Sequence, residues 1–408
     1  MHAQLASASL AIGPTPTAHF GVGSVTRLGH VLAAIGCTKA VIITDAGLAA
    51  TPVVAAVRAA AGDAGMQVTT FSGVHANPTT DDLAAGADAV TGFAESGLAE
   101  SRLAKSGLAE SGLAVAALVA VGGGSSIDAA KGIAIAAVNS QRGRDLDYRG
   151  DFAARALPIV AVPTTAGTGA ETNAFGVVTD PATRRKFYVG HASTMPAAAI
   201  LDPELTLGLP RVPTAATGFD ALTHAVESYL SVRANPWADG IAIQVIKMIA
   251  GHLARSCDDG TDLEARSQLL LAAHMAGIGM ATTGLGLVHA IGHALGGRYD
   301  IPHGMTLAMV LPQVLRFTEP VRSQRLAMIA FALDVGDAGR DTAWNAAAAI
   351  DGLTTLRDEI GLAVRPADFG ITEHDFEAIA ADALDDEVLA NAPRKPTAAE
   401  IQTILATA

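Results

Sequence analysis

Four short apolar segments in the first 165 residues are each followed by a loop of small or polar residues, and this repeated pattern restricts the possible folds most. The segments are residues 40–44, 67–74, 114–124 and 157–165. Stretches rich in Ala and Val with helical spacing lie between them. Near-continuous apolar strands that alternate with helices are typical of a parallel sheet covered on both faces. The sequence therefore predicts an α/β domain over residues 1–210.

The pattern changes near residues 209–213. From about Pro213 onward the sequence shows long Ala, Leu and Ile periodicity and no convincing strand. We therefore expect an all-helical domain over residues 211–408. Half of the 408 residues are hydrophobic and only 4% are aromatic, so small aliphatic side chains must fill the cores of both domains. The net charge of −13 argues against nucleic acid as a partner, because binding to phosphates needs clustered Lys and Arg.

Residues 94–113 follow neither strand nor helix periodicity. They read AESGL, AESRL, AKSGL and AESGL, which are four tandem pentapeptides. On a helix a step of five residues rotates the leucines by about 140° each, so they form no single apolar stripe. We interpret the segment as an exposed insert that extends the end of a helix, with a docking role for a partner as the alternative.

A triple glycine connects an apolar strand to a helix in the stretch ALVAVGGGSSIDAAKG. Glycines at 122–124 allow a sharp turn and a close approach of the backbone to a ligand. Ser125 or Ser126 can cap the helix, and we expect Asp128 in its first turn. A helix N-terminus behind such a loop suits a pyrophosphate. A purely structural turn is the alternative.

Polar residues follow two other predicted strands. Asp45 can accept hydrogen bonds from the ribose hydroxyls of NAD and would repel the 2′-phosphate of NADP; a helix-capping role is equally compatible with its position. Thr164, Thr165 and Thr168 can bond phosphate and ribose oxygens. Three such loops at strand ends fit the rule that ligands of open α/β sheets bind at the carboxyl ends of the strands.

Histidines and a carboxylate are spaced for metal binding in the helical half. Asp220 and His224 are four residues apart, so both lie on one helical face, and His289 and His293 repeat that spacing. His303 follows after Gly-Gly and Ile-Pro breaks and can turn back toward them. One carboxylate with three of these imidazoles would make a site for a divalent transition metal with a position left for substrate. Capped or core pairs are the alternative.

Residues 267–297 form a run without a charged residue that is long enough to span a bilayer. Because the run contains three histidines, we interpret it as a buried helix. The two cysteines, Cys37 and Cys257, are far apart in sequence and match no disulfide framework or zinc motif. The N-terminus lacks the features of a signal peptide. We therefore expect a cytoplasmic protein in a reducing compartment.

The chain resembles the iron-containing (group III) alcohol dehydrogenases. The stretches that carry the resemblance, in the order of the family, are ITDAGL, FSGVHANPT, VGGGSSIDAAKG, PTTAGTGAET, DPELTLGLP, GFDALTHAVESY and GLGLVHAIGHALGGRYDIPHG. The resemblance implies a dinucleotide-binding α/β domain, a helical domain and an active site in the cleft between them. It also implies NAD and a single Fe²⁺, sometimes replaced by Zn²⁺, and hydride transfer between an alcohol and its aldehyde or ketone. Homodimers are frequent in the family.

The resemblance also implies roles for individual residues. The metal ligands would be Asp220, His224, His289 and His303. His293 would be a catalytic residue beside the metal but not a ligand, and Phe175 would line the substrate pocket. The cofactor would contact Asp45, Asn77, Gly122, Gly123, Gly124, Ser125, Asp128, Thr164, Thr165, Thr168 and Lys186.

Two departures and two rival activities accompany the resemblance. The pentapeptides have no counterpart in the family, and Gly169 to Asn173 read GAETN where the family commonly reads GSEVT, which bears on nicotinamide contacts and substrate choice. Sugar-phosphate cyclases share the fold but need clustered Lys and Arg for an acidic substrate, and the 267–297 run has neither. Maleylacetate reductases depart at the ligand positions, which are all present here.

Overall fold

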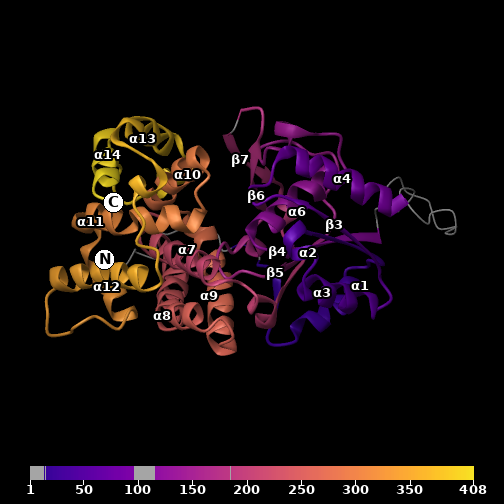
Figure 1. The fold of residues 1–408 in the computed structure, drawn as a ribbon, viewed down its shortest axis with the longest axis horizontal. Coiled ribbons are helices and arrows are strands. Elements are labelled where there is room, and N and C mark those ends of the chain that lie inside the picture. Colours follow the sequence, from indigo (N-terminus) through magenta and orange to yellow (C-terminus); the bar gives the residue numbers. More distant parts are fainter. Residues whose placement is uncertain (1–12, 14, 96–114, 184) are drawn as a thin grey trace, which may run out of the picture. The chain divides into compact units, whose positions relative to one another are not determined.

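The computed structural model describes residues 13, 15–95, 115–183 and 185–408. The chain divides into two compact units. The α/β unit comprises Thr15–Thr165 and Ala170–Thr206, and the helical unit includes Ala166–Gly169 and Leu207–Ala408. Figure 1 colours the α/β unit from indigo to magenta and the helical unit from magenta to yellow.

A six-stranded sheet forms the centre of the α/β unit, in the order β1-β8-β5-β4-β2-β3. Every neighbouring pair in this sheet is parallel, so the carboxyl ends of all strands meet at one edge. The strands are β1 (Thr17–Phe20), β2 (Lys39–Asp45), β3 (Gln67–Val74), β4 (Ala116–Gly122), β5 (Ile159–Pro163) and β8 (Ala198–Leu201).

Helices cover both faces of this sheet. Along β4, Leu118 and Ala120 pack into one apolar core while Val119 and Val121 pack into the other. A strand buried on both faces has no polar side to show, which is why these segments read as continuous apolar runs. The helices of the unit are α1 (Leu28–Ala34), α2 (Ala46–Ala49), α3 (Pro52–Gly62), α4 (Thr80–Glu95) and α6 (Gly124–Ala136).

The four strands expected from the sequence are confirmed as β2, β3, β4 and β5. The sequence did not predict the short strands β1 and β8, which pair with each other in parallel at the other side of β5. It also did not predict the antiparallel hairpin of β6 (Phe175–Asp180) and β7 (Arg185–Gly190), which forms a separate two-stranded sheet.

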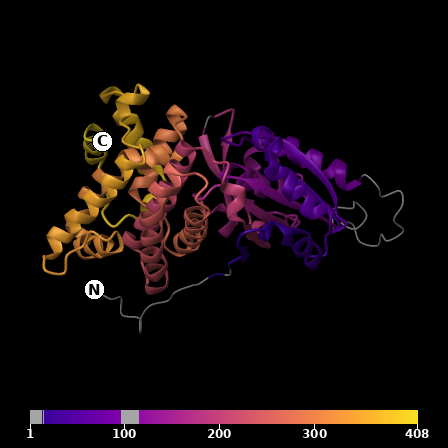
Figure 2. The ribbon, with the colours of Figure 1, turned by 60° about the horizontal axis from the view of Figure 1, so that its bottom comes forward.

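The second unit is helical, as expected: residues 211–408 are all described and contain no strand. Helix α7 packs against α8, α9 and α11, and its residues from Gly218 to Leu230 are all buried. This part of α7 is therefore enclosed by its neighbours. Figure 2 shows the helical unit, coloured from rose to yellow, as helices alone. The helices are α7 (Arg211–Leu230), α8 (Pro236–Asp258), α9 (Leu263–Thr283), α10 (Leu287–Tyr299), α11 (His303–Ala332), α12 (Thr342–Glu359), α13 (Phe376–Asp385) and α14 (Ala398–Ala406).

The charge-free run at 267–297 is not one buried helix, and that expectation was wrong. The run is divided between α9 and α10, which are bent by 107° at a short break. Gly284 adopts a positive φ of 67° there, a conformation that glycine adopts without strain. Among the described residues no single helix is long and apolar enough to cross a membrane, and the bent pair α9–α10 meets that test only by length and composition.

The pentapeptide segment, apart from its first two residues, lies outside the described residues. Ala94 and Glu95 are the last residues of α4. The interpretation of the repeats as an exposed insert therefore stays a prediction.

Candidate metal centre and cofactor-binding residues

Helix α7 places a carboxylate and an imidazole on one buried face. Asp220 and His224 are one helical turn apart, and both side chains are almost fully buried. Oδ1 of Asp220 lies 3.2 Å from Nε2 of His224. A helix buried on all sides normally carries apolar residues. A polar pair at its centre is costly unless hydrogen bonds, ion pairs or a bound ion compensate for its burial.

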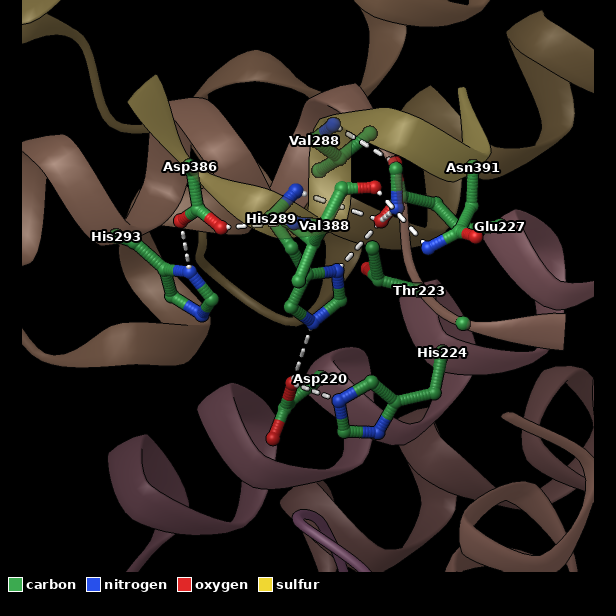
Figure 3. A network of polar contacts seen from close by, with 12 residues as sticks. Asp220, Thr223, His224, Glu227, Val288, His289, His293, Asp386, Val388 and Asn391 are labelled. Carbon is green, nitrogen blue, oxygen red and sulfur yellow. Dashed lines mark hydrogen bonds and ion pairs between the residues drawn. The ribbon is translucent and has the colours of Figure 1, made fainter. Parts of the chain in front are cut away.

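Helices α10 and α11 bring two further imidazoles to the same carboxylate, and Figure 3 shows the first of them, His289, above Asp220. His289 follows two residues after the start of α10, and His303 is the first residue of α11. Nε2 of each lies 3.6 Å from Oδ1 of Asp220. The chain between them turns at Asp300, which has a positive φ of 52°. The expectation that His303 turns back toward α10 is confirmed.

The separations around Asp220 suit a shared cation. Ligand atoms at about 2.1 Å from a tetrahedral ion lie roughly 3.4 Å from one another. One ligand atom each of Asp220, His224 and His289 lie within 4.8 Å of one another, and His303 approaches the same oxygen from α11.

Buried atoms without hydrogen bonds support the same reading. Among the described residues, Oδ1 of Asp220, Nδ1 of His224 and Nε2 of His289 are buried and have no hydrogen-bond partner. Leaving such groups unpaired is costly. A bound cation would give a partner to two of them, the Asp220 oxygen and the His289 nitrogen. The residues present therefore fit a divalent metal.

The protonation of the cluster follows from burial and mutual contacts. Burial disfavours the charged form of His224 and lowers its pKa to about 4, although Asp220 opposes this. Burial also disfavours charged His289, but the nearby carboxylates of Asp220 and Glu227 outweigh it and raise its pKa to about 9. For Asp220 burial acts to raise the pKa, and the surrounding histidines reverse this and lower it. The cluster therefore combines an ionised carboxylate with a neutral imidazole at neutral pH.

His293 lies one turn beyond His289 on α10 and has a partner of its own. Its Nδ1 lies 2.7 Å from Oδ2 of Asp386, the residue that precedes a 3₁₀ helix at Glu387–Asn391. Its ring stacks on that of His303, with centroids 5.4 Å apart. His293 is therefore next to the candidate ligands, while its Nδ1 is held away from Asp220 by another carboxylate (Figure 3).

Sequence reasoning missed two carboxylates at this site, Glu227 and Asp386. Glu227 is buried on α7 and lies 2.6 Å from Nδ1 of His289. A signal for it was present, because it lies seven residues after Asp220 and so on the same helical face. Asp386 had no local signal, since it is 93 residues from His293 in the sequence.

The expected cofactor residues of the α/β unit gather at the carboxyl edge of its sheet. At this edge Asp45 of β2 pairs in register with Val74 of β3, and Gly122 of β4 pairs with Pro163 of β5. The ends of these four strands are therefore adjacent. Thr164 donates its backbone N–H to Gly122 at 3.0 Å. Thr168 differs from the others because it lies in the segment Ala166–Gly169, which packs with the helical unit.

The glycine loop has the close contacts that its residues suggest. Gly122 has a φ of 146°, and a Cβ there would lie 2.4 Å from the Ser126 hydroxyl. Gly123 is the N-cap of α6 and Gly124 is the first residue of that helix. No side chain caps α6, so the expected cap by Ser125 or Ser126 was wrong. Ser125 instead directs its hydroxyl to the carbonyl of Ala76.

Asp45 and Lys186 each make a contact within the unit. Asp45 caps α2 by accepting a hydrogen bond of 2.8 Å from the N–H of Leu48, so the capping alternative is observed. Lys186 donates to Oδ1 of Asn77 at 3.1 Å. This bond joins the hairpin to the loop after β3.

Asp128 is not in the first turn of α6 and faces inward, which corrects the expected position. Its Oδ2 accepts a hydrogen bond of 2.9 Å from Val177, and its Oδ1 lies 3.6 Å from Nζ of Lys131. Lys131 is fully buried and donates to Ala170 O, Phe175 O and Asn173 Oδ1 at 2.6–2.9 Å.

These bonds explain where two other residues point. Asn173, at the position where the chain departs from the family pattern, also accepts from the N–H of Phe175 at 3.1 Å, so its amide oxygen serves internal bonds. The ring of Phe175 is exposed and meets Tyr188 edge to face, with centroids 5.6 Å apart.

Comparison with known proteins agrees with this arrangement. The model of iron-containing alcohol dehydrogenases matches residues 14–98 and 102–203, and the model of the C-terminal part of the Fe-containing alcohol dehydrogenase family matches residues 214–408. The first match is interrupted within the pentapeptides.

Relatives of similar length resemble the chain over nearly its whole length. The NAD-dependent methanol dehydrogenase of Bacillus methanolicus is 36% identical over 96% of this chain and 97% of its own. The lactaldehyde reductase of Escherichia coli K12 is 34% identical over 96% and 97%. Among solved structures, the alcohol dehydrogenase of Oenococcus oeni is 31% identical, covers 98% of this chain and 100% of its own, and has a TM-score of 0.89. The chain therefore belongs to the iron-containing alcohol dehydrogenase family and is itself an alcohol dehydrogenase.

Proposed function

We propose that the protein interconverts small alcohols and their aldehydes or ketones by hydride transfer with NAD(H), at one divalent metal ion held by Asp220, His224, His289 and His303. The observation that carries the proposal is the approach of three imidazoles to one buried carboxylate oxygen at 3.2–3.6 Å. The requirement for NAD(H) and a divalent metal accords with membership of the family.

The chain's own groups set up the chemistry of this site. A bound divalent cation would stabilise an alkoxide and polarise a carbonyl. Asp220 supplies the negative charge that such a cation requires, and neutral His224 supplies a lone pair. Both side chains are buried, which limits the access of competing water to them.

His293 is the proposed catalytic residue. Asp386 accepts the proton of Nδ1, which leaves Nε2 of His293 to accept or release a proton of the substrate hydroxyl. A ring nitrogen of histidine can both accept and donate a proton, so His293 can perform both steps.

The α/β unit is proposed to bind NAD(H) at the carboxyl edge of its sheet. The N-terminus of α6, with residues 122–125, would hold the pyrophosphate, since it has no side-chain cap. Asp45 would contact the adenosine ribose, and Phe175 would line the substrate pocket. Other proposed contacts are Asn77, Asp128, Thr164, Thr165, Thr168 and Lys186.

Further features of the proposal concern the ion, the assembly and the location. We propose Fe²⁺ as the native ion, with Zn²⁺ as a replacement, and a homodimer, both on the strength of the family resemblance. A cytoplasmic location accords with two buried, unlinked cysteines.

A panel of alcohols and aldehydes tests the activity. Protein reconstituted with Fe²⁺ without oxygen should change NADH absorbance with at least one small apolar alcohol or diol. The same protein treated with a chelator should lose this activity and regain it with Fe²⁺. Activity that survives removal of the metal would contradict the proposal.

A further inference from the structure

Glu227 is a buried carboxylate on the same face of α7 as Asp220 and His224, and neither the spacing argument nor the family resemblance gave it a role. Its side chain is 7% exposed. Burying a carboxylate is costly unless donors surround it, so the partners of Glu227 indicate what it does.

Four N–H groups lie around this carboxylate (Figure 3). Oε1 accepts from the backbone of Val288 at 2.7 Å. Oε2 accepts from the backbone of Gly286 at 3.1 Å and of His289 at 3.4 Å, and from Nδ1 of His289 at 2.6 Å. Both oxygens are therefore used, and all four donors come from the start of α10 or the residue before it.

Three of these bonds replace a cap on α10. The N-cap residue is Gly286, which has no side chain to accept the first amides of the helix. A Cβ at that position would lie 3.0 Å from Oε1 of Glu227, so glycine leaves room for the carboxylate. Glu227 thereby fixes the position of α10 just after the bend from α9.

The fourth bond decides which nitrogen of His289 is offered to a metal. A carboxylate in this setting only accepts, so Nδ1 of His289 must carry a hydrogen. Nε2 is then the nitrogen left for coordination, and it lies 3.6 Å from the Asp220 oxygen. A carboxylate behind a coordinating histidine also increases the basicity of that ligand.

We propose that Glu227 is a positioning residue of the metal centre, which holds the start of α10 and the ring of His289 so that Nε2 meets the ion together with Asp220 and His224. This inference rests on the proposed function. It implies that the ligands are arranged before the metal binds, because every bond of Glu227 is made within the chain.

The isosteric change Glu227→Gln tests the inference. An amide cannot accept from all four donors, and if its NH₂ faces Nδ1, His289 carries its proton on Nε2, which blocks coordination. The measurement is the dissociation constant for Zn²⁺ in competition with a fluorescent chelator, at a temperature where thermal unfolding of the metal-free protein shows the variant to be fully folded. We expect Zn²⁺ binding about 10–100-fold weaker than in the wild type.

Matched variants separate the outcomes. Glu264→Gln on the exposed start of α9 controls for the loss of one negative charge and should bind Zn²⁺ as the wild type does.

Two variants together decide between the outcomes. If folded Glu227→Gln binds Zn²⁺ within threefold of the wild type while His289→Ala loses Zn²⁺ binding, Glu227 is merely structural and the inference fails, whereas the proposed metal site stands. If His289→Ala also binds as the wild type does, the proposed site fails with it. Should Glu227→Gln not fold, Glu227→Asp keeps the charge at shorter reach and must weaken Zn²⁺ binding at least threefold for the inference to survive.

Discussion

The candidate metal centre and the candidate cofactor site are built in opposite ways. In the helical unit the chemistry lies in side chains, most of them buried. His289 shows the principle, because Glu227 fixes its Nδ1 while its Nε2, on the side of Asp220, has no hydrogen-bond partner. In the α/β unit the chemistry lies mostly in backbone at strand ends, where Gly122 and Gly123 allow close approach. A metal needs a few ligand atoms at fixed separations, while a pyrophosphate needs N–H groups and space.

The difference predicts how each site responds to substitution. A site made of buried side chains should lose its ligand when a single partner changes. A site made of backbone should tolerate most side-chain changes except at glycines and at residues that hold loops in place. Lys131 is the exception in the α/β unit, because it is a buried cation that holds the segment leading to Phe175.

The largest expected effect is therefore on stability, from Lys131→Met. The substitution removes three hydrogen bonds and leaves the partly buried Asp128 without its cation, so we expect a loss of about 3–5 kcal/mol in the free energy of unfolding. Urea unfolding measures it, with Lys247→Met on the exposed side of α8 as the control. A loss below about 1 kcal/mol would show that the α/β unit does not depend on this cation.

The next effect is the pH dependence of metal binding. His289, with a pKa of about 9 in the metal-free protein, holds an extra proton at neutral pH that a metal must displace. Zn²⁺ binding should tighten by about tenfold per unit from pH 7 toward pH 9 for this proton alone, and the gain should end above the pKa. His224, with a pKa of about 4, adds no dependence in this range. Competition titrations at several pH values measure this, and a flat profile would contradict the protonation scheme.

A smaller effect concerns cofactor choice. In Asp45→Gly we expect the ratio of NADP to NAD efficiency, as kcat/KM, to rise on the order of tenfold, because the substitution removes the carboxylate that we propose faces the 2′-phosphate. Glycine at the N-cap of α2 costs only a few tenths of a kcal/mol, so the fold should be preserved. Equal efficiency of the unchanged enzyme on both cofactors would argue against this role of Asp45.

The sequence predicted local features of both units better than features that depend on distant partners. The strands β2, β3, β4 and β5 and the pairing of Asp220 with His224 follow from patterns that are local in the sequence. Strands β1 and β8 are each four residues long, and β1 pairs with β8 across some 180 residues, while β8 also pairs with β5. The helix break at 284–286 depends partly on Glu227, which caps α10 from another helix.

The sequence also failed to predict side chains whose surroundings in the fold differ from those typical of their residue type. A lysine is normally exposed, so nothing in the sequence of α6 indicates that Lys131 is an internal donor. The hydroxyl of Ser125 was expected at a cap but points to the Ala76 carbonyl, because Gly123 occupies the cap position. The contact of His293 with Asp386 depends on how α10 meets the residues after α13.

The assignment of ligands is tested most directly by metal content measured beside turnover in three variants. His289→Ala and His303→Ala each remove an imidazole near Asp220 and should be purified with little metal and almost no activity. His293→Ala should keep its metal, while its turnover falls and its pH profile changes, because Asp386 holds that ring beside the proposed ligands. If His293→Ala loses its metal while His303→Ala retains it, the assignment of the four ligands is wrong.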